Sequence, residues 1–222
     1  MDMRVSSISS PTFSSRNKTI RFADDIARHV NKEFPRVSQT LAEGLNNADK
    51  FPNLMGRLKK DITEMRDIKY DAFERSKDFK TKLLSFVAPI KVYKKGNCGE
   101  SAELAMLMAK ANGIQNCKKC SLKTPKGRSY DHAVVLVEDK KPYIIDAWLG
   151  FADYVPNAIK RYQGEFRQHF DFKGLKTEKM VVQKGADTYY SNKFLNQKFT
   201  KKNLETLKKG FPSFVIKKNN KK

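Results

Sequence analysis

The chain has 222 residues, of which 39% are hydrophobic and 11% aromatic. These values exclude a chain that is disordered throughout, and they allow one full hydrophobic core, so we expect a single globular domain with extensions. The 45 Lys and Arg residues outnumber the 24 Asp and Glu residues and give a formal net charge of +21. Such a charge favours polyanionic partners, whether nucleic acid, an anionic lipid surface or an acidic protein.

Cysteine content and hydropathy indicate where the protein works. Three Cys residues, without the paired spacing of a disulfide framework, favour a reducing compartment such as the cytoplasm. The first residues lack the continuous apolar run of a signal peptide, and no window reaches the length of a transmembrane segment. We therefore expect a soluble protein without a signal peptide.

The first ninety residues are expected to be mostly helical. Residues 1–19 contain six Ser, one Pro and no apolar periodicity, which indicates a flexible arm. From residue 20 to residue 89, apolar side chains recur at helical spacing in stretches that Pro35 and Phe51-Pro52 separate. These apolar positions are Phe22, Ile26, Ala27 and Val30, then Val37, Leu41 and Leu45, then Leu54, Leu58, Ile62, Met65 and the aromatic-rich run to Pro89.

The sequence pattern changes after Pro89. Residues 90–93 (Ile-Lys-Val-Tyr) are consistent with a short strand, which a tight turn connects to Cys98. A run of good helix formers from Ser101 to Ala109 predicts a helix that ends at Asn112-Gly113.

Strands and one more helix are expected after this helix, which is rich in Ala. Turn-forming segments separate three apolar runs, which predicts strands at 117–122, 133–137 and 143–146. Residues 152–166 predict a helix that packs over the sheet. The apolar content of the remaining chain indicates folded structure to about Ile216, followed by a frayed Lys tail at 217–222. One helix followed by an antiparallel meander is an α+β layout.

A thiol, an imidazole and a carboxylate stand at the edges of these elements. Cys98 precedes the Ala-rich helix, His132 lies at the head of one expected strand, and Asp146 lies near the end of the next. A helix N-terminus and a neighbouring imidazolium both favour the thiolate form of a cysteine. A carboxylate beside the imidazole orients the ring, as in a catalytic triad. The three residues therefore predict a cysteine nucleophile for acyl transfer.

The tetrahedral intermediate of acyl transfer needs hydrogen-bond donors for its oxyanion. The Cys98 backbone N–H is one candidate. Asn97 is a second, although Asn is equally suited to be the helix N-cap. Trp148 is a further candidate for contact with the oxyanion or the substrate. We expect neither a cofactor nor a metal.

Three motifs carry a resemblance to a known superfamily. They are Gly96-Asn97-Cys98-Gly99-Glu100, Asp131-His132-Ala133-Val134-Val135 and Ile144-Ile145-Asp146-Ala147-Trp148. In order and spacing they resemble the transglutaminase-like branch of the papain-like cysteine enzymes, of the kind carried by bacterial effectors and toxins. Those domains usually have Asp-Pro-Trp in the third motif. The oxyanion-hole Gln typical of papain-type enzymes is not identified here.

The resemblance covers roughly residues 90–165 and implies both a fold and a reaction. It implies Cys98 as nucleophile, His132 as general base and acid, and Asp146 as the orienting carboxylate. The implied fold is a papain-like or transglutaminase-like α+β core, in which a central helix bearing the Cys packs on an antiparallel sheet.

By this interpretation residues 90–216 form a catalytic core with a basic C-terminal extension, preceded by a helical N-terminal region at 20–89. The implied activity is that of a cysteine protease, deamidase or transglutaminase acting on an amide bond of a protein substrate. The same likeness implies a bacterial effector that a dedicated secretion machine delivers into the cytosol of a host cell.

Three alternatives stay open. The spacing of Cys98, His132 and Asp146 is also compatible with arylamine N-acetyltransferases, which need an acyl-coenzyme A site in additional domains. The CxxC pair at 117–120 could form a structural zinc site only together with Cys98 and with His132 or His169. The third alternative is a basic non-catalytic module that binds nucleic acid or an anionic membrane.

The positive charge is concentrated in the C-terminal region. From Lys173 to Lys222 there are 14 Lys, no Arg and 3 acidic residues, so 14 − 3 gives +11. Because Lys is poor at bidentate recognition of bases and phosphates, nucleic acid is a less favoured partner than an acidic protein substrate or an anionic membrane. Aromatic residues between the lysines could stack on bases, but a core equally needs them. They are Tyr189, Tyr190, Phe194 and Phe199.

Overall fold

The computed structural model describes residues 18–33, 52–93, 96–167, 180–184 and 190–216. The expected arm up to residue 17, the apolar stretch at 37–45 and the expected Lys tail at 217–222 lie outside these residues. Lys18 and Thr19 were expected in the arm, but they belong to the first helix.

The protein has an α+β fold, as the sequence predicts. Within the described residues it forms seven α-helices, a short 3-10 helix and a five-stranded antiparallel sheet of strand order β4-β3-β2-β1-β5. The helices are α1 (Lys18–Glu33), α3 (Pro52–Arg75), α4 (Phe79–Tyr93), α5 (Cys98–Ala111), α6 (Val155–Gln163), α7 (Tyr190–Asn196) and α8 (Lys201–Gly210). The strands are β1 (Cys117–Lys123), β2 (Ser129–Val137), β3 (Tyr143–Asp146), β4 (Phe151–Tyr154) and β5 (Val181–Lys184).

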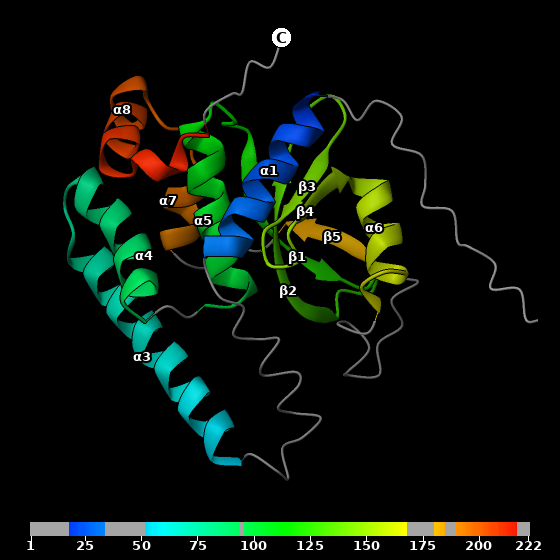
Figure 1. Ribbon diagram of the computed structural model, residues 1–222, viewed down its shortest axis with the longest axis horizontal. Helices are drawn as coiled ribbons and strands as arrows, with labels where there is room; N and C mark the ends of the chain where they lie inside the picture. Colours follow the sequence, from blue (N-terminus) through cyan, green and yellow to red (C-terminus); the bar gives the residue numbers. More distant parts are fainter. Residues whose placement is uncertain (1–17, 34–51, 94–95, 168–179, 185–189, 217–222) are drawn as a thin grey trace, which may run out of the picture.

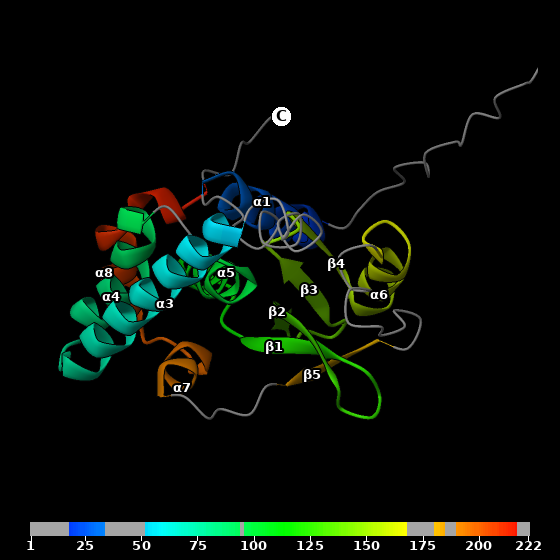
Figure 2. The ribbon, with the colours of Figure 1, turned by 90° about the horizontal axis from the view of Figure 1, so that it is seen from below.

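Helices cover both faces of the curled sheet (Figure 1). Figure 2 shows α1 and α5 on one side of the sheet and α6 on the other. Neighbouring residues of a strand point to opposite faces. Val135 and Ile145 accordingly join the core that includes α1 and α5, whereas Val134 and Ile144 join a second core that includes Tyr162 of α6.

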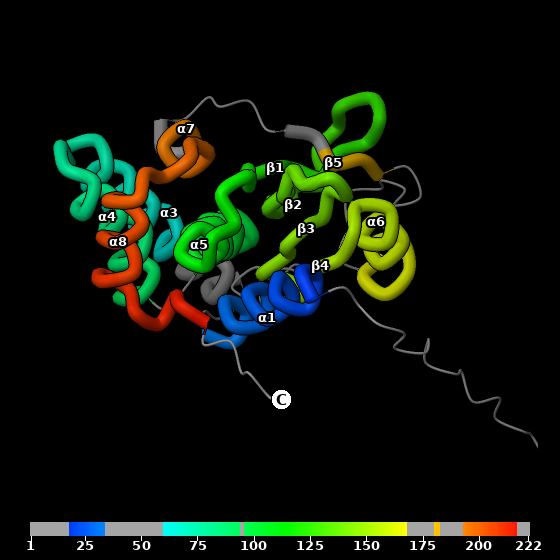
Figure 3. Tube along the Cα trace, turned by 90° about the horizontal axis from the view of Figure 1, so that it is seen from above, coloured from blue at the N-terminus to red at the C-terminus, as the bar shows by residue number. Residues whose placement is uncertain are grey.

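A helical group lies on the side of α5 away from the sheet. Figure 3 shows that α3, α4 and α8 form this group, with α5 between it and the strands. The predicted apolar stripes are confirmed where the side chains are described: Ile26, Ala27 and Val30 of α1 and Met65 of α3 are buried. Because helices surround α5 on the sides that the sheet leaves open, nearly all of its side chains are buried.

Residues 90–93 do not form the strand that the sequence suggests. They are the last turn of α4, which continues through Pro89 to Tyr93. Proline in a helix removes one backbone hydrogen bond and usually bends or ends the helix. Here Phe86, Val87 and Ile90 are buried around it, and their packing supports the helix across the proline.

The prediction of a helix at 152–166 was also wrong for its first residues. Residues Phe151–Tyr154 form β4, an antiparallel partner of β3, and α6 starts only at Val155. Gly150 has φ 76° in the turn before β4, a conformation that glycine adopts without strain. Pro156 at the start of α6 is the local signal for the helix start.

In the described parts of the C-terminal region, residues 180–184 form β5 and residues 190–216 fold into α7, α8 and a short 3-10 helix. Phe194 packs edge-to-face on Phe73 with ring centroids 5.5 Å apart, and Phe199 does so on Phe79 at 4.9 Å. These two aromatic rings therefore serve the core between α3, α4 and α7, and they are not surface platforms for bases. None of the helices in the described ranges combines the length and apolar character needed to cross a membrane.

Candidate active site

Cys98 is the first residue of α5, where a capping box fixes the helix start. Asn97 is the N-cap, and its Oδ1 accepts a hydrogen bond from the Gly99 N–H at 2.9 Å. The Asn97 N–H in turn donates to Glu100 Oε2 at 3.1 Å. Because Cys98 begins the helix, its side chain lies at the positive end of the helix dipole. The residue is half-buried.

A distortion of β2 directs His132 toward this thiol. Residues 130–132 oppose the single β1 residue Leu122, which is a β-bulge, and Asp131 has φ 56°. Bulges bend a strand and re-aim its side chains. His132 is buried as a result, while Asp131 is exposed and its carbonyl oxygen accepts a hydrogen bond from Cys98 Sγ at 3.7 Å.

The carboxylate of Asp146 is fully buried and accepts three hydrogen bonds. Oδ2 faces His132 Nε2 at 2.7 Å and accepts the Tyr162 hydroxyl at 2.9 Å. Oδ1 accepts the Leu149 backbone N–H at 2.9 Å. The Gly150 N–H closes the turn onto the Asp146 carbonyl oxygen at 2.8 Å. This arrangement leaves the carboxylate one orientation, with one oxygen held against the imidazole.

The structure thus brings together the three residues of the predicted triad. Burial alone would lower the pKa of His132, but the charge and hydrogen bond of Asp146 and the contact with the Cys98 side chain raise it to about 10. The imidazole is therefore cationic at neutral pH. Because Asp146 engages Nε2, Nδ1 is the ring nitrogen left for the thiol.

The further candidates for oxyanion or substrate contact, Asn97 and Trp148, occupy different positions. The Asn97 side chain caps α5 through its carbonyl oxygen, which is the N-cap alternative that the sequence left open. The capping bonds use the backbone N–H groups of Asn97, Gly99 and Glu100 and not that of Cys98. Trp148 is buried and lies edge-to-face on the His132 ring, with centroids 5.2 Å apart. It restrains the imidazole on one side.

Two polar residues of α1 support the loop after Asp146, and sequence reasoning missed them. Asn31 Nδ2 donates to the carbonyl oxygens of Ala147 at 3.1 Å and Trp148 at 2.8 Å. Asp24 Oδ1 accepts the Ala152 N–H at 2.9 Å. The available signal was the position of Asp24 on the apolar face of α1, because a polar group there needs a partner in the core.

Tyr162 and a charged group on α3 were missed as well. No motif pointed to Tyr162, which lies in the segment that was expected to form a helix packed over the sheet. The charged group consists of Arg66 and Lys69, whose partners are Glu100 and Glu103 of α5. Two glutamates three residues apart share one helix face. In a helix that is otherwise mostly apolar, they indicated buried charges in need of partners.

The two cysteines of β1 lie in different cores, and Cys120 shares its core with Cys98 and Trp148. Cys117 packs in the core with α5, whereas Cys120 packs in the core with α6, because a spacing of three places strand residues on opposite faces. Burial raises the pKa of the Cys117 thiol. Among the described residues no group of three His, Cys, Asp or Glu side chains could hold a metal ion, and His169 lies outside them.

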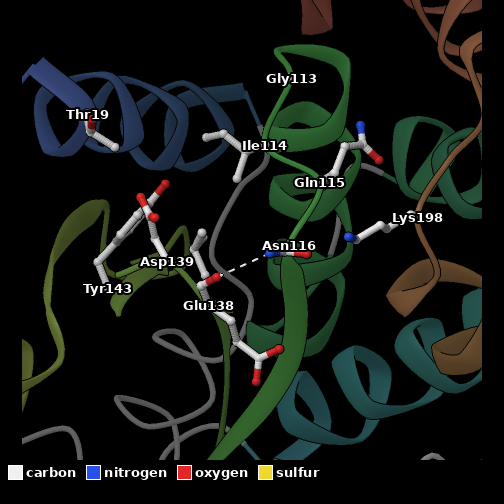
Figure 4. Close-up of a pocket in the computed structure, with 10 residues that line it drawn as sticks. Thr19, Gly113, Ile114, Gln115, Asn116, Glu138, Asp139, Tyr143 and Lys198 are labelled. Carbon is white, nitrogen blue, oxygen red and sulfur yellow. Dashed lines mark hydrogen bonds between the residues drawn. The ribbon is translucent and has the colours of Figure 1, made fainter. Parts of the chain in front are cut away.

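An open pocket with a volume of about 400 Å³ lies at the other end of α5. Figure 4 shows its walls: Thr19 of α1, the segment after α5, the turn between β2 and β3, and Lys198. Asn116 Nδ2 donates there to the Glu138 carbonyl oxygen at 3.4 Å, and the Glu138 carboxylate pairs with Lys118 at 3.0 Å. The pocket contains none of the triad residues.

Comparisons of the chain with protein-family models, with curated proteins and with solved structures found no match. Function is therefore inferred from the residues and geometry of this site alone.

Proposed function

We propose that this protein is a cysteine-dependent acyl-transfer enzyme that acts on an amide bond of a protein substrate. The observation that carries the proposal is the 2.7 Å contact between His132 Nε2 and Asp146 Oδ2, with Cys98 at the N-terminus of α5 in hydrogen-bonding reach of the same imidazole. A thiol, an imidazole and an orienting carboxylate in contact are the parts that nucleophilic acyl transfer requires.

The reaction follows from these roles. The Cys98 sulfur attacks the amide carbonyl, so that a C–S bond forms and the carbonyl electrons move to the oxygen. The C–N bond then breaks as His132 gives its proton to the leaving amine or ammonia, and a thioester remains. Water or a second amine attacks the thioester, His132 takes the proton of this acceptor, the C–S bond breaks, and the Cys98 thiolate is regenerated beside the cationic imidazole. The Cys98 backbone N–H is the proposed oxyanion donor.

The acceptor and the leaving group define the type of enzyme. Water as acceptor gives a protease when the cleaved amide is a peptide bond and a deamidase when it is a side-chain carboxamide. An amine as acceptor gives a transglutaminase. The three motifs and a Cys-bearing helix packed on an antiparallel sheet support the transglutaminase-like branch of the papain-like superfamily.

The test is the reaction of the full chain with an electrophilic thiol probe, followed by mass-spectrometric mapping of the labelled residue. We expect Cys98 to be labelled, and Cys98→Ala to abolish labelling. Cys117→Ala and Cys120→Ala are the matched controls, since both thiols are 1% exposed, and neither should reduce the labelling. Preferential labelling of Cys117 or Cys120 in the folded protein would contradict the proposal.

The surface of α8 supports a second candidate, binding to an anionic membrane. Lys201, Lys202, Lys208 and Lys209 are all exposed on this helix, and Glu205 is its only acidic residue. Clustered lysines are attracted to anionic lipid, and the attraction weakens with salt. The burial of Phe199 in the core removes one of the aromatic rings that nucleic acid would need for stacking.

Co-sedimentation with vesicles that contain phosphatidylserine tests this candidate. Replacing Lys201, Lys202 and Lys208 by Gln should abolish salt-sensitive binding. Replacing the exposed Lys126, Lys140 and Lys141 removes the same charge elsewhere, and it should leave most of the binding. Equal losses in the two variants would show that only net charge matters and would remove the role of α8.

A further inference from the structure

Five charged side chains lie together beneath the first turn of α5. Arg66 of α3 forms two hydrogen bonds with Glu100, at 3.0 and 3.2 Å. Lys69 of the same helix bridges Glu100 at 3.2 Å and Glu103 at 2.8 Å. Lys119 of β1 reaches Glu103 from the opposite side at 2.9 Å. We call this set the α3–α5 charge cluster.

The centre of the cluster is buried, its Arg66 and Lys119 ends are partly exposed, and the cluster carries a net positive charge. Lys69 and Glu103 are 0% exposed. Burial would favour neutral forms, but the opposite charges raise the pKa values of Arg66 and Lys69, lower that of Glu103, and lower that of Glu100 to about 2. Arg66, Lys69, Glu100 and Glu103 are therefore ionised at neutral pH. Counted with Lys119, three basic and two acidic side chains give a formal charge of +1.

The cluster contacts both neighbours of Cys98. Glu100 accepts the backbone N–H of Asn97, which precedes Cys98. A Cβ placed on Gly99, which follows Cys98, would lie 3.7 Å from Lys119 Nζ and 4.0 Å from Arg66 Nη2. The cationic groups at the solvent-facing ends of the cluster thus border the turn that carries the thiol.

We propose that the α3–α5 charge cluster is a positioning and electrostatic element for Cys98. It holds the first turn of α5 in place through the capping bond of Glu100, and its surplus positive charge stabilises the thiolate that attacks the substrate. This inference rests on the proposed function. It assigns part of the reactivity to α3, which lies outside the three sequence motifs.

Stability alone does not account for buried ion pairs at this position. Removing charges from water is costly, and a buried ion pair is often no more stabilising than well-packed apolar side chains. Apolar residues on α3 and α5 could dock the two helices equally well. Apolar residues could not supply a positive potential at the thiol. Such a potential falls off more slowly in a protein interior of low dielectric constant than in water.

Variants that change the charge of the cluster in opposite directions separate the two roles. Lys119→Met lowers the net charge to 0, and Glu103→Gln raises it to +2. A merely structural cluster would respond to both changes in the same way. An electrostatic one should respond with opposite signs. Lys118→Met, the next residue on β1, is the control, because Lys118 pairs with Glu138 and not with the cluster.

The experiment measures the rate of Cys98 alkylation by iodoacetamide between pH 5 and pH 10 in the full chain, with mass mapping. On the acid side of the profile, Lys119→Met should react on the order of three- to tenfold more slowly than the wild type, and Glu103→Gln faster by a similar factor. The midpoints of the profiles should move to higher and lower pH, respectively. Lys118→Met should follow the wild-type profile.

Shifts of the same sign, or none, in the two folded variants would overturn the inference. If Glu103→Gln does not fold, Arg66→Met and Glu100→Gln form a second opposed pair, since a Gln at position 100 retains the capping bond. Failure of the proposed function is a different result: Cys98 of the wild type would then react no faster than an unfolded thiol at any pH.

Discussion

The two ends of α5 are both built from buried polar side chains, but they use different partners. At the N-terminal end, Glu100 and Glu103 are held by the charged side chains of α3 and β1. At the C-terminal end, Lys110 is fully buried and donates to the Gln197 carbonyl oxygen at 2.8 Å. Asn112 donates there to the carbonyl oxygen of Phe214 at 2.6 Å.

The difference indicates that the two ends of α5 have different roles. Backbone carbonyls accept the hydrogen bonds of the buried Lys110, no carboxylate among the described residues pairs with it, and burial lowers its pKa. That end therefore anchors the C-terminal segment. The N-terminal end instead holds five acidic and basic side chains beside a half-buried thiol. Charge is thus concentrated at the end of α5 where the proposed chemistry takes place.

The largest effect is expected from removal of the imidazole at the N-terminal end. His132→Ala should slow the alkylation of Cys98 at pH 6 on the order of 10²-fold, because an ordinary thiol with a pKa of about 8.5 is less than about 1% ionised there. His29→Ala on α1 is the matched control and should leave the rate unchanged. An unchanged rate of Cys98 alkylation in folded His132→Ala would contradict a special role of the N-terminal end of α5.

The next effect concerns the two buried lysines. Lys69→Met should destabilise the protein by about 3–5 kcal/mol, because it leaves buried carboxylates short of a partner. Lys110→Met should cost about 1–3 kcal/mol, since it leaves only carbonyl acceptors unsatisfied. Urea denaturation of both variants measures the two values. In addition, only Lys69→Met should change the alkylation profile of Cys98. A similar change in Lys110→Met would contradict the different roles of the two ends of α5.

The pH dependence of stability reports the charge of His132. The pKa of His132 is raised from about 6.5 to about 10 in the folded state, so its contribution is fully present below pH 6.5, declines as the pH rises, and is lost as the pH passes 10. The difference in unfolding free energy between the wild type and His132→Gln should therefore shrink from pH 6 to pH 10. A difference that grows over this range would rule out the cationic imidazole.

The smallest effect is expected at Asp131. Its left-handed backbone costs a residue with a side chain roughly 1–2 kcal/mol, and glycine avoids this cost while losing about 0.5–1 kcal/mol in chain entropy. Asp131→Gly should raise the stability by at most about 1 kcal/mol in thermal denaturation. Asp131→Val should destabilise, since a β-branched residue fits this conformation poorly.

Much of the fold was readable from local patterns. The helix at 98–111 and the strand at 143–146 followed from helix formers, turn residues and apolar runs. The errors occurred where tertiary contacts override local preference. Residues 90–93 are helical because Ile90 is buried against neighbouring helices, and residues 151–154 are a strand because β3 offers hydrogen bonds to them.

The sequence by itself determined which groups are candidates for the reaction: a thiol at the start of a helix, an imidazole that was expected at a strand end and lies within β2, and a carboxylate at the end of β3. Only the tertiary structure decided how these groups are supported. Tyr162 on Asp146, Asn31 on the Trp148 loop, and Lys69 between Glu100 and Glu103 join residues 16 to 117 positions apart. Such contacts depend on how the elements pack, and local sequence carries no record of which distant side chain completes a buried hydrogen bond.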